Sequence, residues 1–301
     1  MENGIEKIKK VKRIIEMPSF CKEARENILK NFESKTDGLD IERVSEFLWS
    51  LDLPVSEFVF FNDEDLPELD NLCKDLFDLK NSFANGVQGS YLSELDIIFV
   101  RKGAVEEKNI DSVSMEGVLV HEQAHASNTY EDYSEIENAV WRPRCGFVLP
   151  CTKFPWGSFL EEGFADLLRG EYSSQNISDR EKEKNILKEK EIENSPHIPY
   201  RISRKYFYND EESRSAGNPD GIVWSGSSIA ATGLEMLCEK EPKLRQTLIE
   251  SRSDIEKLRE IPRLINAIKP GLYLEIQKCA YSEDEFARVQ QIIIDAVQNS
   301  K

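Results

Sequence analysis

The residues His121-Glu-Gln-Ala-His125 constrain the fold more than any other feature of the sequence. Two histidines four residues apart lie one above the other on the same face when the chain around them is an α-helix. The preceding segment agrees, because Asp111 or Ser112 is a suitable N-cap and apolar residues follow at helical spacing. We therefore predict a helix that begins near Ser112 and ends near residue 128.

This pair of imidazoles has the spacing of a metal site. Two histidines on one helix face can bind the same zinc ion, and the carboxylate of Glu122 can then act on a metal-activated water. A catalytic zinc site needs three protein ligands and one open position. The only other histidine in the chain is His197. The residue types therefore favour a carboxylate as the third ligand.

Charge and composition exclude several classes of partner and location. Acidic residues outnumber basic ones, 56 to 39, which gives a net charge of −17. Nucleic acids and anionic membranes both attract a basic surface, so we expect neither as a partner. No apolar run of about 18 residues is present, and residues 1–17 lack the apolar core of a signal peptide. We expect a cytoplasmic protein with reduced cysteines.

The spacing of apolar residues predicts helices and a small sheet before the motif. Helical spacing occurs over residues 5–33, 40–51 and 65–81. The clearest strand covers 91–100, and a shorter one covers 58–61. Strands and helices do not alternate regularly, so we do not expect a doubly wound parallel sheet.

The chain after the motif is predicted to be mainly helical. Residues 141–157 contain three prolines, which predicts an ordered loop, and a helix follows from about Ser158. The highly charged residues 173–195 predict a solvated helix or a mobile insertion rather than a binding tail. Amphipathic spacing predicts further helices over 223–251 and 283–298.

The helix after Ser158 contains the sequence Leu160-Glu-Glu-Gly-Phe-Ala-Asp166. Downstream of a His-Glu-x-x-His helix, this context resembles the gluzincin metallopeptidases, in which a second helix supplies a glutamate to the metal. The resemblance covers about residues 112–172. A Gly-x-Met-Glu-Asn segment, with which aminopeptidases of this group hold the free amine of a substrate, is not evident.

The resemblance implies zinc-dependent hydrolysis of peptide bonds in a peptide or protein substrate, with one Zn²⁺ per chain. It implies three metal ligands, His121, His125 and Glu162. It gives Glu122 the role of general base. Asp166, one turn beyond Glu162, would orient a zinc-bound histidine through the second ring nitrogen of that histidine.

The glutamate that binds the metal has one alternative, because Glu161 precedes Glu162. A shift of one residue turns a side chain about 100° around a helix, so only one of the two can face the metal. Ala165 and Asp166 follow at the positions that the resemblance requires, which favours Glu162.

The tetrahedral intermediate of peptide hydrolysis carries an oxyanion that needs a donor besides the metal. Gluzincins take this donor from a later tyrosine or histidine. The candidates here are His197, Tyr200, Tyr206 and Tyr208. We place His197 and Tyr200 first.

The expected fold is α+β and mainly helical. It has a zincin-like core in which a small mixed or antiparallel sheet covers the active-site helix, and a helical C-terminal part. We expect a single domain over 1–301 with four regions: a helical N-terminal region (1–85), a catalytic core (86–172), a charged insertion (173–222) and a helical C-terminal region (223–301).

Two other classes of function compete with hydrolysis. In the first, the chain is a non-catalytic protein that keeps zinc for stability or for partner binding. In the second, it is a helical interaction protein in which the motif is accidental. Glu122 argues against the first alternative, because a structural zinc site needs no base and is usually closed by a fourth protein ligand.

Overall fold

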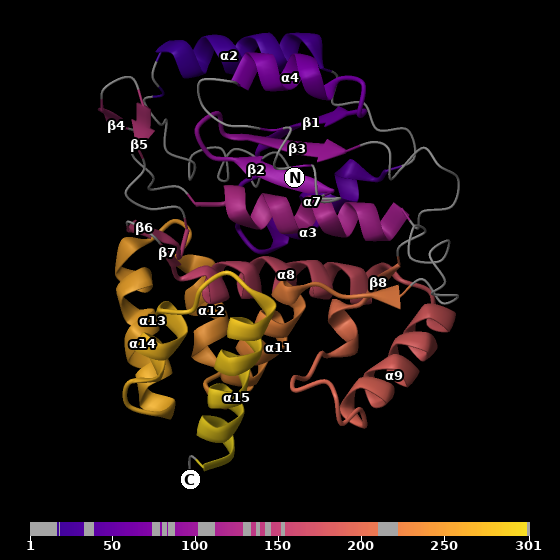
Figure 1. Ribbon diagram of the computed structural model, residues 1–301, viewed down its shortest axis with the longest axis vertical. Helices are drawn as coiled ribbons and strands as arrows, with labels where there is room; N and C mark the ends of the chain where they lie inside the picture. Colours follow the sequence, from indigo (N-terminus) through magenta and orange to yellow (C-terminus); the bar gives the residue numbers. More distant parts are fainter. Residues whose placement is uncertain are drawn as a thin grey trace. The chain divides into compact units, whose positions relative to one another are not determined.

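The computed structural model of the chain has the predicted α+β, mainly helical fold (Figure 1). The residues that it describes are 17, 19–32, 39–73, 79, 83, 88–101, 112–128, 134–136, 139–141, 146–151, 154–209 and 222–299. The first part of the helix predicted over 5–33 lies outside these residues. The chain divides into two compact units, Met1–Cys145 and Gly146–Lys301. The single-domain organisation stays a prediction.

The first unit contains a three-stranded mixed sheet in the order β1-β3-β2. β1 (Glu57–Phe61) runs parallel to β3 (Ile97–Arg101), and β2 (Gly89–Leu92) runs antiparallel to β3. The register pairs Gly89 with Val100. The small mixed sheet is therefore confirmed, and β1 confirms the short strand predicted over 58–61.

The single strand predicted over 91–100 is wrong, because a turn divides this segment between β2 and β3. The Leu95 N–H donates to the Leu92 carbonyl at 3.2 Å, and Asp96 has a φ of 50°. Aspartate tolerates this left-handed backbone better than most residues. The sequence pattern hides the turn because Leu95 is fully buried and continues the apolar run.

Helices cover both faces of this sheet. Alternate residues of β1 and β3 join α2 (Ser19–Asn31) and α4 (Leu66–Cys73) in one buried hydrophobic cluster. The intervening residues face the other way, where α7 (Ser112–Ala126) packs on β2 and β3. α3 (Ile41–Ser50) packs in turn on α7 (Figure 1).

Four predicted helices are confirmed in the described part of this unit. α2 and α3 account for the second half of 5–33 and for 40–51, α4 for the first part of 65–81, and α7 for the helix of the histidine motif. The N-cap of α3 is Asp40, whose side chain accepts a hydrogen bond from the Arg43 N–H. A short hairpin follows α7, formed by β4 (Ser134–Ile136) and β5 (Ala139–Trp141).

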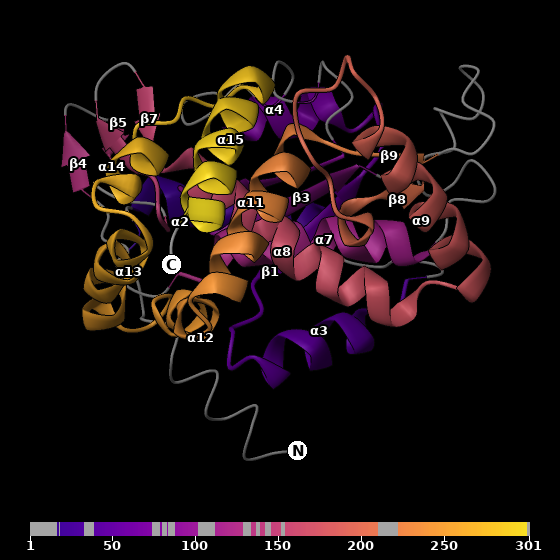
Figure 2. The ribbon, with the colours of Figure 1, turned by 90° about the horizontal axis from the view of Figure 1, so that it is seen from below.

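The second unit is built around α8 (Ser158–Asn176), which is buried along most of its length. α11 (Gly226–Lys240) packs on both α8 and α15 (Glu283–Asn299), and Figure 2 shows it between them. A β-carbon on Gly163 of α8 would lie 3.1 Å from the Ala230 carbonyl oxygen of α11. Glycine therefore permits the close crossing of these two helices.

Shorter elements complete the second unit. The charged segment 173–195 folds largely as α9 (Asp179–Glu193), which begins with a capping box between Ser178 and Glu181. The hairpin of β6 (Leu149–Cys151) and β7 (Phe154–Trp156) occupies part of the predicted loop over 141–157. A two-residue pair, β8 (Tyr208–Asn209) and β9 (Ile222–Val223), follows a 3₁₀ turn at Arg204–Tyr206.

The helical C-terminal region is confirmed and is more divided than the sequence predicts. The stretch 223–251 contains both α11 and α12 (Lys243–Glu250). α13 (Ile255–Ile268) and α14 (Leu272–Gln277) were not predicted. α13 contains Pro262, which normally argues against a helix, and α14 is too short to show a period.

Candidate metal centre

His121 and His125 lie one turn apart on α7, and both rings are half-buried. Their Nε2 atoms are 3.1 Å apart, and the rings meet edge to face with centroids 4.8 Å apart. Two nitrogens this close together can bind the same ion, so the pair fits a metal site.

The helix that carries these histidines is fixed to the rest of its unit by buried side chains. Gln123, which is fully buried, accepts a hydrogen bond from the Ser56 N–H at 2.7 Å and donates to the Ser56 carbonyl at 2.8 Å. Glu116, also buried, accepts from the Asp40 N–H at 2.9 Å and pairs with Arg43. Because Gln123 lies between the two histidines, its bonds fix the rotation of α7 where the imidazoles project.

Glu122 lies beside the first histidine and is buried, with 8% of its surface exposed. Its side chain lies against the backbone of Gly89 in the edge strand β2, since a β-carbon built there would be 2.9 Å from the Glu122 Cγ. The Glu122 carboxylate is therefore buried beside the two histidines and packed against β2.

On α8 the two adjacent glutamates have different surroundings. Glu161 is buried, forms an ion pair with Arg252 at 3.2 Å, and accepts a hydrogen bond from the Phe147 N–H at 2.8 Å. The guanidinium of Arg252 lies 4.3 Å from the ring centroids of both Phe147 and Phe164. Glu161 is therefore held inside the second unit, and half-buried Glu162 is the glutamate that remains for a metal.

His121, His125 and Glu162 form a group that could hold a metal ion, and among the described residues it is the one such group. Two imidazole nitrogens and one carboxylate oxygen suit zinc, and three protein ligands leave a position for water. The donor set alone also suits other divalent transition metals.

Asp166 is fully buried on α8, one turn beyond Glu162. Its Oδ2 accepts hydrogen bonds from Arg169 at 2.9 Å, from the Ser228 hydroxyl at 3.0 Å and from the Ser225 hydroxyl at 3.4 Å. Arg169 also donates to the Tyr206 carbonyl at 3.4 Å. A buried carboxylate with a cation and two hydroxyls around one oxygen is held in a fixed orientation.

The candidates for an oxyanion donor occupy different surroundings. His197 is exposed in the turn after α9, and Tyr208 lies in β8. Tyr206 is buried, and its hydroxyl donates to Glu235 at 3.2 Å. The half-buried Tyr200 donates its hydroxyl to Glu283 at 2.7 Å, and burial together with Glu283 raises the pKa of this phenol. The roles predicted for His197 and Tyr200 stay predictions.

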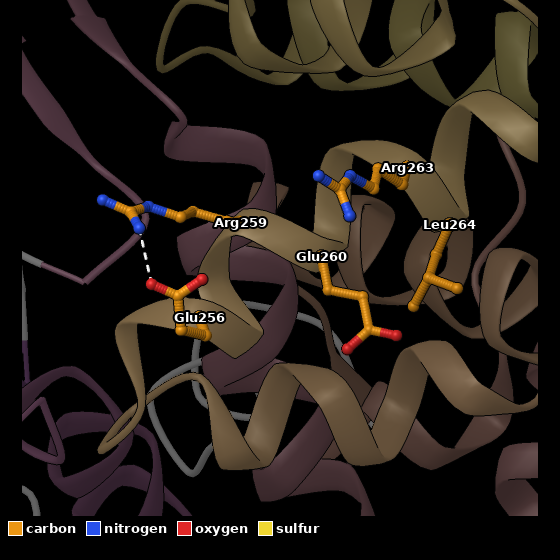
Figure 3. A pocket seen from close by; sticks show the side chains of 5 residues that line it. All are labelled: Glu256, Arg259, Glu260, Arg263 and Leu264. Atoms are coloured by element: carbon orange, nitrogen blue, oxygen red, sulfur yellow. Dashed lines mark hydrogen bonds and ion pairs between the residues drawn. The ribbon is translucent and has the colours of Figure 1, made fainter.

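A separate hollow lies along α13 in the second unit. Its lining consists of charged side chains and one leucine, namely Glu256, Arg259, Glu260, Arg263 and Leu264 (Figure 3). Glu256 and Arg259 point toward each other and form an ion pair. Opposite charges one turn apart on a single helix are typical of a solvated face, so this hollow gives no second candidate site.

Comparison with known proteins adds no family: no family model, no curated protein and no solved structure matches the chain. In the part of the chain that the structure describes, no helix combines the length and the apolar character that crossing a membrane requires.

Proposed function

We propose that this protein is a zinc-dependent hydrolase of peptide bonds, with His121, His125 and Glu162 as ligands of one zinc ion. The observation that carries the proposal is the group of these three donors, together with a buried carboxylate, Glu122, beside the first of them. The resemblance of the two sequence segments to gluzincin metallopeptidases is the reason for choosing a peptide bond as the substrate.

Zinc, when bound there, supplies a Lewis acid that lowers the pKa of water and polarises a carbonyl group. Glu122 takes the proton from the attacking water and later passes it to the leaving amine. Its buried position beside β2 keeps the carboxylate in one place, which favours proton transfer over a short fixed distance.

Asp166 orients one of the metal-bound imidazoles through the ring nitrogen that does not face the metal. The support for this role is the set of hydrogen bonds from Arg169, Ser225 and Ser228, which occupy Oδ2 and fix the orientation of the carboxylate. An ionised carboxylate behind an imidazole increases the basicity of the ligand and fixes its ring orientation.

The proposal is tested by measuring zinc content and hydrolysis in the same preparations. We expect about one zinc per chain and cleavage of a quenched fluorescent peptide library. Glu122→Gln should keep the zinc and lower kcat by about 10²–10⁴-fold, because general-base catalysis contributes that much. The matched control is Glu256→Gln on the exposed face of α13, which should change neither quantity.

The other classes of function give different results in this experiment. Zinc binding without cleavage of any peptide by the wild-type protein would indicate a non-catalytic zinc protein. Full activity in Glu122→Gln would contradict the mechanism, and absence of bound zinc would contradict the metal centre itself.

A further inference from the structure

Gly89, the first residue of β2, lies very close to the histidine helix of the first unit. Gly89 is buried, and a β-carbon at this position would lie 2.9 Å from both Val118 Cγ1 and Glu122 Cγ. It would also lie 3.2 Å from Glu122 Oε1. Val118 and Glu122 are one turn apart on α7, so both project toward the same point of β2.

Glycine is required at position 89 because there is no room for a side chain, and not because of its backbone conformation. The described glycines with positive φ are Gly146, Gly157 and Gly271, and Gly89 is not among them. An alanine could therefore adopt the same backbone, but its methyl group would overlap with two side chains. β-carbons essentially never approach other heavy atoms to less than 3.0 Å, so a neighbour would have to move.

The helix itself cannot retreat easily, because Gln123 ties it to the backbone of Ser56 through two hydrogen bonds. Val118 is β-branched and stiff at χ1, whereas glutamate has three rotatable side-chain bonds. A side chain at position 89 would therefore displace the carboxylate of Glu122 more readily than the helix backbone.

We infer that Gly89 is a positioning residue for Glu122: the lack of a side chain in β2 sets where the carboxylate lies. This inference rests on the proposed function for the role of Glu122 as the base. The geometry that supports it lies wholly within the first unit.

The test compares Gly89→Ala, Val118→Ala and the double variant in the full-length, zinc-loaded protein. In Gly89→Ala we expect kcat to fall by about 10²-fold, since a misplacement of about 1 Å has that effect, with KM and zinc content unchanged. The kcat is calculated per bound zinc, so that only folded, metal-loaded protein is counted. A loss of folded protein alone would lower activity and zinc content in proportion and would leave the kcat per bound zinc unchanged.

The double variant distinguishes the effect of a clash with Val118 from the effect of a clash with Glu122. Val118→Ala removes the methyl group that an alanine at 89 would meet, so the double variant should fold even if Gly89→Ala does not. It should keep the low kcat. The matched control is Gly226→Ala at the start of α11, where an added β-carbon would meet nothing closer than 3.6 Å.

Restoration of kcat in the double variant would overturn the inference, as would unchanged kcat in Gly89→Ala. If the wild-type protein hydrolyses nothing, the proposed function fails, and crystal structures of wild type and Gly89→Ala then decide the inference. A displaced Glu122 carboxylate would support the positioning role, and an unmoved one would overturn it.

Discussion

Glu161 and Arg252 form an ion pair in the interior of the second unit, with side chains 4% and 1% exposed. Glu161 directly precedes Glu162 in sequence, so the pair fixes the start of α8 beside that residue. The β-carbon of any residue other than glycine at 146 would meet both partners, at 2.2 Å from Glu161 Oε2 and 2.4 Å from Arg252 Nη1. The surroundings of this pair therefore leave no space for rearrangement.

We predict that Arg252→Met destabilises the protein by about 3–5 kcal/mol, because it leaves the Glu161 carboxylate buried without its cation. Chemical denaturation measures this loss. The double variant Arg252→Met with Glu161→Gln should recover part of the stability, because the uncompensated charge of Glu161 is removed. Arg259→Met, which breaks the exposed pair with Glu256, is the control and should cost at most about 1 kcal/mol. Equal losses in the two arginine variants would contradict a buried, coupled pair.

Substitutions of the neighbouring residues Glu161 and Glu162 should have different effects on zinc affinity. We predict that Glu162→Gln weakens zinc binding strongly, because a neutral amide replaces an anionic ligand, whereas Glu161→Gln retains zinc. Isothermal calorimetry against a competing chelator measures the affinities. Zinc should also raise the wild-type unfolding free energy, by about 2.7 kcal/mol at a free concentration of 100 Kd. Weaker binding in Glu161→Gln than in Glu162→Gln would reverse the assignment.

The hydroxyl of Ser228 gives a test of the environment of Asp166. Ser228→Ala removes the 3.0 Å hydrogen bond to Oδ2. We predict that Asp166→Asn lowers zinc affinity by about 10–100-fold, and that Ser228→Ala lowers it by less, because Arg169 still holds the carboxylate. Ser251→Ala is the matched control, since this buried serine donates to the Leu248 carbonyl. Unchanged affinity in Asp166→Asn would remove this residue from the metal centre.

Local patterns explain what the sequence could predict. The helix around His121 and His125 follows from a spacing of four residues, and the amphipathic helix α15 follows from its apolar period. The prediction of one strand over 91–100 is wrong because Leu95, which is buried in the turn, has the same apolar character as the strands beside it. Hydrophobicity alone cannot distinguish a buried turn residue from a strand residue.

Contacts between distant segments could not be predicted in this way. Arg252 is 91 residues from Glu161, and no local period links them. Gly89 precedes Glu122 by 33 residues, and a single glycine before an apolar stretch gives no sign of its neighbour. The choice of Glu162 over Glu161 rested on a resemblance in sequence. The structure adds a physical reason: Glu161 already forms an ion pair with Arg252 and accepts a hydrogen bond from the Phe147 N–H.

The last prediction concerns alkaline pH. Burial first, and then Glu235, raises the pKa of Tyr206 well above its usual value of about 10. The folded state therefore holds this proton more tightly than the unfolded chain, so the contribution of Tyr206 to stability is complete below pH 10 and is lost as the pH rises above it.

Three buried thiols also contribute to the loss of protein stability at alkaline pH, because their pKa values are raised to about 12: Cys73, Cys238 and Cys279. The pH dependence of the wild-type protein alone therefore does not report on Tyr206. Tyr206→Phe isolates the tyrosine: the difference in unfolding free energy between wild type and variant should be constant from pH 7 to 9 and should shrink above pH 10. A constant difference up to pH 11 would show that the Tyr206 phenol ionises alike in the folded and unfolded states.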